Sequence, residues 1–273
     1  MMTKTEYFAQ GTTEEKEASA VYKTVYRMNE SKVLVRELEL DAGLGEEITL
    51  SMLTDMHIRK ERNDILCAVR NAMECASFSD LTILCGDNIE SISDSEHLRI
   101  LKEEVWEKYP DTICVVGNHD QFYGDAVENR KLLDSVWPHD PYCYSRVLNN
   151  KLMILAVDDN TGAFWEGLCD KIEKELSFAR KNGLSVLLFV HIAFPGLNME
   201  IEENKKTYEM VRSYADVVKA TFSGHNHVDY YGEFPGFYKD ADGNTVERNI
   251  PVYKLQANSE PDFTGNVLYI KVK

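Results

Sequence analysis

Five short apolar segments that each end on a polar residue constrain the fold of this chain more than any other feature. Each segment has the length and apolar content of a buried β-strand. The residues at which they end are Asp55, Asp87, Asn118, His191 and His225. Strands that alternate with helical patterns favour an open α/β sheet, which binds ligands at the carboxyl ends of its strands. We therefore expect these five residues to lie at one edge of one sheet.

The hydrophobic pattern predicts a polar tail or docked segment over residues 1–20 and one α/β domain over residues 21–273. Strands are predicted within 21–40, where a hairpin is compatible with the pattern, and at 48–53, 81–85, 112–116, 142–147, 151–157, 185–190, 217–222, 230–234, 252–255 and 267–272. Helices are predicted at 63–73, 95–106, 126–136, 165–181 and 204–214.

The composition disfavours membranes and nucleic acids as partners. The 273-residue chain is 44% apolar, but no apolar run approaches the roughly 20 residues that a membrane-spanning helix needs. Its formal net charge of −16 disfavours broad nucleic-acid binding. The start of the chain lacks the pattern of a secretory signal, and the six cysteines form no C-x-x-C pair. We therefore expect a reduced protein in the cytoplasm.

The strand ends belong to five motifs rich in side chains that bind metals or transfer protons. Five of the seven histidines fall within the motifs. An aspartate at a strand end is commonly a helix cap, and a lone histidine after an apolar strand is usually a core residue. In combination the motifs instead indicate one shared site. They are Asp55-Met56-His57, Gly86-Asp87-Asn88, Gly117-Asn118-His119-Asp120, His191 and Gly224-His225-Asn226-His227.

These side chains have the donor types that suit two divalent metal ions. Mixed imidazole and carboxylate sites bind Mn, Fe or Zn, alone or mixed, and the donor types do not choose among them. Two ions about 3.5–4 Å apart need a bridging carboxylate and a bridging water, which as hydroxide can attack phosphorus in line. Asp87 is the predicted bridge. The remaining predicted ligands are Asp55, His57 and His227 for one ion, and Asn118, His191 and His225 for the other.

The five motifs, in this order, resemble the pattern of the calcineurin-like metallophosphoesterase superfamily, which is D-x-H, G-D, G-N-H-D/E, H and G-H-x-H. The resemblance covers about residues 48–230. It implies a four-layer α/β/β/α sandwich with two mostly mixed central sheets, and a small phosphorylated substrate. It also implies that His119 lies beside the bound phosphate, where it protonates the leaving oxygen or stabilises the transition state.

One departure from the family pattern concerns the residue that orients His119. In the protein-phosphatase branch, this residue is an aspartate three positions after the bridging aspartate. That position is Glu90 here, so Glu90 and Asp120 are both candidates for the orienting role. The longer protein-phosphatase signature places an arginine directly after it, and Ser91 stands there instead. The sequence therefore favours a general small phosphoesterase.

The expected function is hydrolysis of a small phosphomonoester or phosphodiester. A cyclic-nucleotide or dinucleotide phosphodiesterase is the alternative, and a non-catalytic scaffold ranks lower because the ligand set is intact. Phe122, Tyr123 and Trp165 are candidate substrate platforms, although core packing is their ordinary role. Arg59 is a candidate phosphate contact, with membership of a solvated charged run as the alternative. The sequence leaves the substrate and the oligomeric state open.

Overall fold

The computed structural model describes residues 24–28, 33–121, 126–159, 162–259 and 265–273. The predicted N-terminal segment, residues 1–20, lies outside this part of the chain, as do the candidate substrate contacts Phe122 and Tyr123. The six cysteines are free thiols. Among the residues that the structure describes, no helix is both long enough and apolar enough to cross a membrane.

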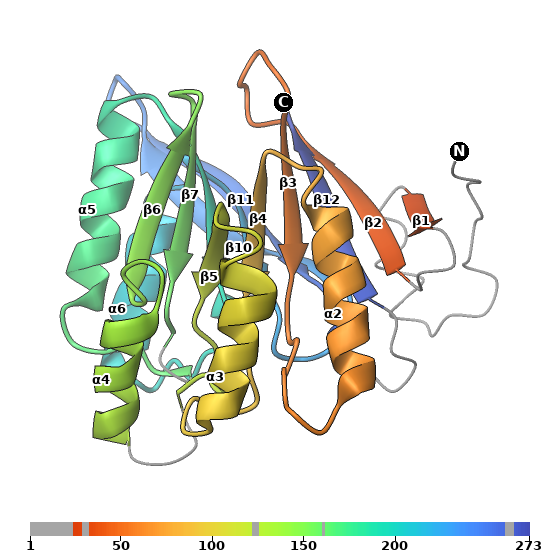
Figure 1. Cartoon of the computed structure of the whole chain (residues 1–273). Helices are drawn as coiled ribbons and strands as arrows, with labels where there is room; N and C mark the ends of the chain where they lie inside the picture. The colour runs from red at the N-terminus through yellow and green to blue at the C-terminus, as the bar shows by residue number, and fades with distance from the viewer. Residues whose placement is uncertain (1–23, 29–32, 122–125, 160–161, 260–264) are drawn as a thin grey trace.

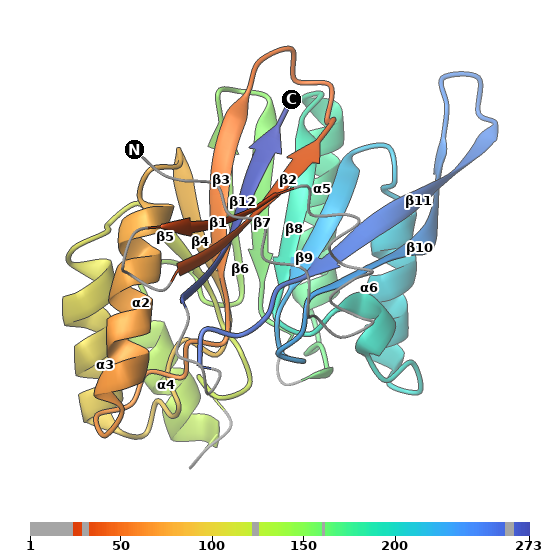
Figure 2. The same cartoon turned by 90° about the vertical axis from the view of Figure 1, so that its right-hand side faces the viewer.

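Two six-stranded mixed sheets form the centre of the molecule, and helices cover their outer faces (Figures 1 and 2). The first sheet has the order β1 (Thr24–Met28), β2 (Val33–Leu40), β12 (Gly265–Val272), β3 (Ile48–Leu53), β4 (Leu81–Cys85), β5 (Thr112–Val115). The second has the order β10 (Tyr230–Lys239), β11 (Thr245–Lys254), β9 (Val218–Ser223), β8 (Ser185–Val190), β7 (Leu152–Val157), β6 (Cys143–Leu148).

Three apolar clusters separate the four layers. The cluster between the sheets includes Leu50, Ile83, Leu187 and Phe222, all fully buried. A second cluster joins the first sheet to its helices, and a third joins the second sheet to its own. The helices are α2 (Asn63–Ala76), α3 (Ser95–Leu101) and α4 (Ala126–Val136) on the first sheet, and α5 (Leu168–Lys181) and α6 (Glu202–Arg212) on the second. This is the α/β/β/α sandwich that the family resemblance implies.

The strands that lead to the motifs are parallel and buried on both faces. β3, β4 and β5 are parallel neighbours in the first sheet, and β7, β8 and β9 are parallel neighbours in the second. Every residue of β4 and β8 is buried, as is usual where helices or a second sheet cover both faces. Figure 1 shows β3 and β7 pointing toward the same end of the sandwich. The carboxyl ends of both sets of strands therefore meet there.

The expectation that all five motifs lie at the edge of one sheet is wrong. Asp55, Asp87 and Asn118 follow strands of the first sheet, whereas His191 and His225 follow strands of the second. Periodicity identifies each strand but not the sheet to which it belongs. Because the sheets pack face to face with their central strands pointing the same way, the motifs still converge.

One hairpin and one helix differ most from their predicted extent. β10 and β11 form a hairpin of ten residues per strand, longer than the predicted 230–234 and 252–255. β10 is an edge strand, which tolerates Pro235, and the outer half of the hairpin is too exposed to show an apolar alternation. The predicted helix over 95–106 is α-helical to Leu101 and continues as a π-helical turn, η1 (Lys102–Trp106).

Candidate metal centre

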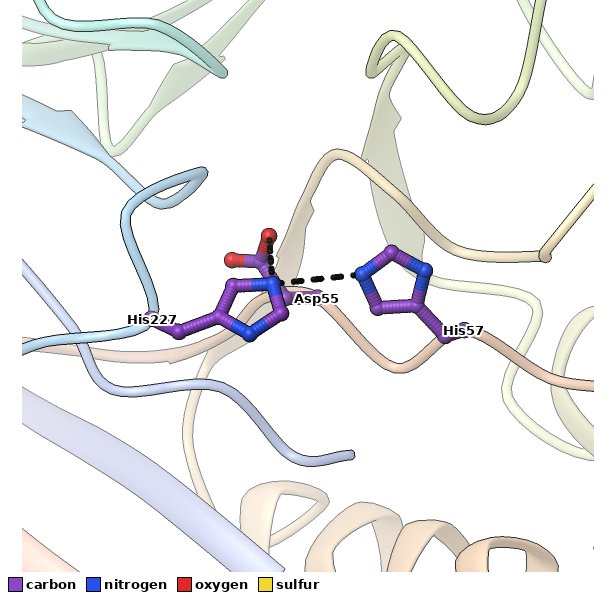
Figure 3. Close-up of side chains that lie close together, drawn as sticks. All are labelled: Asp55, His57 and His227. Carbon is purple, nitrogen blue, oxygen red and sulfur yellow. Dashed lines mark hydrogen bonds and ion pairs between the residues drawn. The ribbon is translucent and has the colours of Figure 1, made fainter. Parts of the chain in front are cut away.

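Three clusters of potential ligand atoms lie at the end of the sandwich where the strands converge. One of them, His57, Glu90 and His119, shares His57 with the first of the two triads defined below. In each cluster, the ligand atoms lie within 4.8 Å of one another. The first triad is Asp55, His57 and His227, and the second triad is Asp87, His191 and His225. Figure 3 shows the His227 ring next to the Asp55 carboxylate and facing the His57 ring. The Nε2 atom of His227 is 3.3 Å from Asp55 Oδ1 and 3.3 Å from His57 Nε2.

One carboxylate oxygen connects the two triads. Asp87 Oδ2 lies 3.1 Å from His191 Nε2 in its own triad and 3.7 Å from His57 Nε2 in the first. The other oxygen, Oδ1, accepts a hydrogen bond of 2.8 Å from the backbone N–H of His119. Asn118 joins the second triad, with its Oδ1 atom 2.9 Å from His225 Nδ1. The predicted ligands therefore converge from both sheets on the predicted bridging residue.

Hydrogen bonds fix the orientation of two of the imidazole rings. His191 Nδ1 donates to the carbonyl oxygen of Cys85 at 2.9 Å, because a carbonyl can only accept. The Nδ1 atom of His57 lies 3.1 Å from Glu90 Oε2, which accepts in the same way. In both rings this leaves Nε2 directed at Asp87. Binding the outer ring nitrogen to a carbonyl or carboxylate is how proteins orient histidines that hold metals.

The carboxylates around His191 favour a positive charge at this position. Burial lowers the pKa of His191, but the carboxylates of Asp87 and Asp55 outweigh it and raise this pKa to about 10. Burial raises the pKa of Asp87, yet the nearby His191 and His57 hold it far below its ordinary value. The buried Nε2 of His191 makes no hydrogen bond, although Asp87 Oδ2 is only 3.1 Å away. A divalent ion would supply the required charge in place of a proton, so the donor set fits a metal.

The backbone of the triads is held in an unusual conformation. Five predicted ligands have positive φ: Asp55 (51°), His57 (43°), Asp87 (51°), His225 (68°) and His227 (58°). In the described part of the chain, only two further non-glycine residues share this feature. Such conformations cost on the order of 1–3 kcal/mol each and persist where the surroundings impose them, often at functional sites. The paired motif residues therefore face one another through strained loops, not through extended strands.

Two motif glycines allow the loops to approach closely. A Cβ atom on Gly117 would overlap the backbone nitrogen and the carboxylate of Asp87. A Cβ atom on Gly224 would overlap the hydroxyl of Thr54 and the carboxylate of Asp55. In both places the neighbouring atoms belong to a ligand or to its immediate support. Any larger residue would therefore displace a predicted ligand.

Substitution of Gly224 tests this close packing. We expect Gly224→Ala to weaken Mn²⁺ binding about 10- to 100-fold, the usual effect of disturbing the support of a metal ligand. Gly196→Ala is the matched control, because a Cβ there would meet only Ile192 at an ordinary contact distance of 3.9 Å. Elemental analysis after dialysis measures the bound metal in both variants. Equal metal content in the two would show that the contact at Gly224 does not support the site.

One side of the centre is open to solvent. The side chains of Asp55 and His191 are fully buried, whereas those of His227, Glu90 and His119 are 36%, 29% and 21% exposed. His119 packs edge to face against the His57 ring, with the ring centroids 4.4 Å apart. Among the residues that the structure describes, the side that carries His119 is therefore an exposed face of the centre, where a substrate can approach.

The two candidates for orienting His119 occupy different places. Glu90 lies at the ring, with its carbonyl oxygen 3.4 Å and its Oε1 atom 3.8 Å from His119 Nδ1. The buried Asp120 carboxylate instead accepts backbone N–H bonds from Gly117, Asn88 and Ile89 at 2.9, 3.3 and 3.0 Å. Burial raises the pKa of Asp120 to about 7, against these donors. Asp120 thus ties the second motif to the third.

The remaining candidate contacts lie at different distances from the centre. Arg59 Nη2 is 3.3 Å from Glu90 Oε2, so its guanidinium lies on the open side of the centre, and its side chain is 34% exposed. Trp165 packs instead against the Tyr142 ring, at a centroid distance of 5.6 Å, with the Arg130 guanidinium 5.7 Å from its own ring. Neither Tyr142 nor Arg130 is among the predicted ligands.

Sequence reasoning missed two residues that support the centre. The hydroxyl of Thr54 lies 2.7 Å from Asp55 Oδ2, to which it can donate its one proton, and 2.9 Å from the Cys85 carbonyl oxygen. Asp159 is fully buried, accepts the backbone N–H of Ile192, and has its pKa raised by burial to about 7. A signal for Asp159 was present, since it follows β7 just as the predicted ligands follow their strands.

One family model matches this chain, and its fold is similar to that of a solved phosphatase. The family model described as calcineurin-like phosphoesterase matches residues 49–229, which include all five motifs. A dimetal phosphatase from Danio rerio has a TM-score of 0.56 at 12% identity, covering 77% of this chain and 87% of that one. A Plasmodium protein described as the anchor in the inner membrane complex has a TM-score of 0.48 at 13% identity, covering 76% and 71%. A purple acid phosphatase from yellow lupin seeds has a TM-score of 0.49 at 12% identity, and the match covers 90% of this chain and 48% of that one. No curated protein matches the sequence.

Proposed function

We propose that this chain, which belongs to the calcineurin-like phosphoesterase family and is a metal-dependent phosphoesterase, hydrolyses a small phosphomonoester or phosphodiester between its two triads. The observation that carries this proposal is the position of Asp87, whose Oδ2 lies 3.1 and 3.7 Å from imidazoles of different triads. A carboxylate shared by two groups of nitrogen and oxygen donors is what a pair of divalent ions needs.

Each triad would hold one ion, with Asp87 shared between them. When bound, the ions would neutralise phosphoryl charge and lower the pKa of the attacking water. The residues of this chain set the geometry: the fully buried Asp55 and His191 fix the inner wall of the centre. Asn118 contributes an uncharged oxygen, which limits the negative charge in the pocket. We propose that the centre binds two divalent ions, which are Mn, Fe or Zn, alone or mixed.

His119 would act on the leaving oxygen. Its backbone N–H is bound to Asp87 Oδ1 at 2.8 Å, so its position is fixed relative to the shared carboxylate. Its ring lies on the open side, beside Glu90, which would orient it. A proton donated from this ring to the leaving oxygen avoids the formation of a free alkoxide. Arg59, on the same side, would contact a phosphate oxygen or hold Glu90 in place.

A substrate panel tests the proposal. The protein is stripped of metal, reconstituted with Mn²⁺, Fe²⁺ or Zn²⁺, and assayed with p-nitrophenyl phosphate and bis-p-nitrophenyl phosphate. We expect turnover only with metal, loss of turnover with a chelator, and close to two ions per chain by elemental analysis. The ratio of the two rates separates a monoesterase from a diesterase. A protein that holds two ions and turns over neither ester, nor cyclic nucleotides or dinucleotides, would contradict the proposal.

A further inference from the structure

Arg36 is a charged residue inside the layer between the two sheets. It lies on β2, where Val33 and Val35 face the helix layer and Leu38 faces the other sheet. By this alternation Arg36 shares the inward face with Leu38, and it is only 2% exposed. A buried guanidinium is tolerated only when its charge and its N–H groups find partners. Those partners show what the residue does.

The partners of Arg36 come from both sheets. Its Nε atom forms an ion pair at 2.5 Å with Asp229 Oδ2, just before β10 of the second sheet, without the geometry of a hydrogen bond. Its Nη1 donates to Asn266 Oδ1 on β12 at 2.9 Å, and its Nη2 donates to Gln256 Oε1 at 3.0 Å. Asp229 is itself buried, and its Oδ1 accepts the backbone N–H of Gln256 at 3.0 Å. The fork of one arginine thus joins the ends of the two sheets.

One branch of this network reaches His227. Asp229 follows His227 by two residues, so its ion pair with Arg36 anchors the loop that carries the His227 ring. This loop needs an anchor because His227 has a positive φ of 58° and its ring is 36% exposed.

The other branch reaches Asp55. The side-chain Oδ1 of Asn258 accepts the backbone N–H of Asn266 at 2.6 Å. The Nδ2 and backbone N–H of Asn258 each donate to the carbonyl oxygen of Thr54 at 3.2 Å. Thr54 directly precedes Asp55 and donates to its carboxylate. The network therefore supports the first triad on both sides, from the first sheet and from the second.

We propose that Arg36 is a positioning residue that sets the separation of Asp55 and His227. The inference rests on the proposed function, because it concerns the residues that would hold one of the two ions. The second triad has supports of its own, such as the bond from His191 to the Cys85 carbonyl. Loss of Arg36 should therefore weaken the first triad selectively.

The test replaces the buried pair as a unit. In the double variant Arg36→Met with Asp229→Leu both charges are removed, and such apolar replacements are commonly neutral for stability. Mn²⁺ titration with detection of the free ion by EPR measures each binding step, and the melting temperature reports the fold. We expect the double variant to stay folded, with a lower melting temperature because Asn266 and Gln256 lose hydrogen-bond partners, to keep one tight ion, and to bind the other about 10- to 100-fold more weakly. Adding His227→Ala to it should cause little further loss.

Lys271→Met is the matched control. Lys271 on β12 pairs with Glu37 on β2 at 3.4 Å, and these are the strands that carry Asn266 and Arg36. This control should bind two Mn²⁺ like the wild type. A double variant that is folded and binds two ions tightly would overturn the positioning role. If the double variant does not fold, Arg36→Lys keeps the charge without the fork and must show the same selective loss; tight binding of both ions would overturn the proposal. A wild type that binds none of Mn²⁺, Fe²⁺ and Zn²⁺ would instead refute the proposed function.

Discussion

The variant Asp87→Asn is expected to lose both ions and at least about 10³-fold in turnover, since the metals supply several kcal/mol of transition-state stabilisation. Asparagine keeps the shape of the side chain and can still accept the His119 N–H, which lies 2.8 Å from Oδ1. It removes the negative charge that faces His191 and His57 at 3.1 and 3.7 Å. Metal content and initial rates are measured on the same preparation.

Asp80→Asn is the control for this variant. Asp80 also accepts a backbone N–H, from Thr49 at 2.8 Å, but it precedes β4 whereas Asp87 follows it. It should retain wild-type metal content and rate. If Asp87→Asn kept both ions, another residue would have to be the bridge, and the assignment of Asp87 would be wrong.

The variant His119→Gln is expected to lower kcat by about 10²- to 10⁴-fold, the usual contribution of a general acid, while both ions remain bound. In the wild type, the His119 ring packs against the His57 ring, with the centroids 4.4 Å apart, but His119 belongs to neither the first nor the second triad. The loss should be smaller for p-nitrophenyl phosphate than for an alkyl phosphate, because nitrophenolate leaves without needing a proton. Rates with the two esters, together with metal content, check this expectation.

His139→Gln serves as the histidine control, because His139 Nε2 accepts the backbone N–H of Cys114, away from the centre. Its rates with both esters should match those of the wild type. Two results would count against the acid role of His119: loss of metal together with activity, or an equal loss of rate with the good and the poor leaving group.

Local elements of this fold could be predicted where burial made them distinct. β3, β4 and β8 have their predicted bounds, since a doubly covered strand is a continuous apolar run bounded by polar residues. The helix α4 also has its predicted bounds. The position of β12 could not be predicted. It lies between β2 and β3, pairing parallel with one and antiparallel with the other. An apolar run shows that a strand exists, but its partners are chosen by packing over more than 200 residues of chain.

The convergence of these side chains could be predicted because each one lies within four residues of the end of a strand, and the direction of parallel strands then brings them together. The residues that support these side chains could not be predicted from the sequence. The left-handed backbone at Asp55 and His227 is imposed by surrounding contacts, not by residue type. Arg36 was overlooked because a single charge within a strand pattern indicates an exposed face, whereas here its partners lie about 190 to 230 residues further along the chain.

The most direct test is a crystal of the Mn²⁺-loaded protein measured on both sides of the manganese absorption edge. We predict two anomalous peaks per chain, one at Asp55, His57 and His227 and the other at Asn118, His191 and His225, each in contact with the Asp87 carboxylate. A single peak, or two peaks of which one does not touch Asp87, would contradict the shared-carboxylate centre.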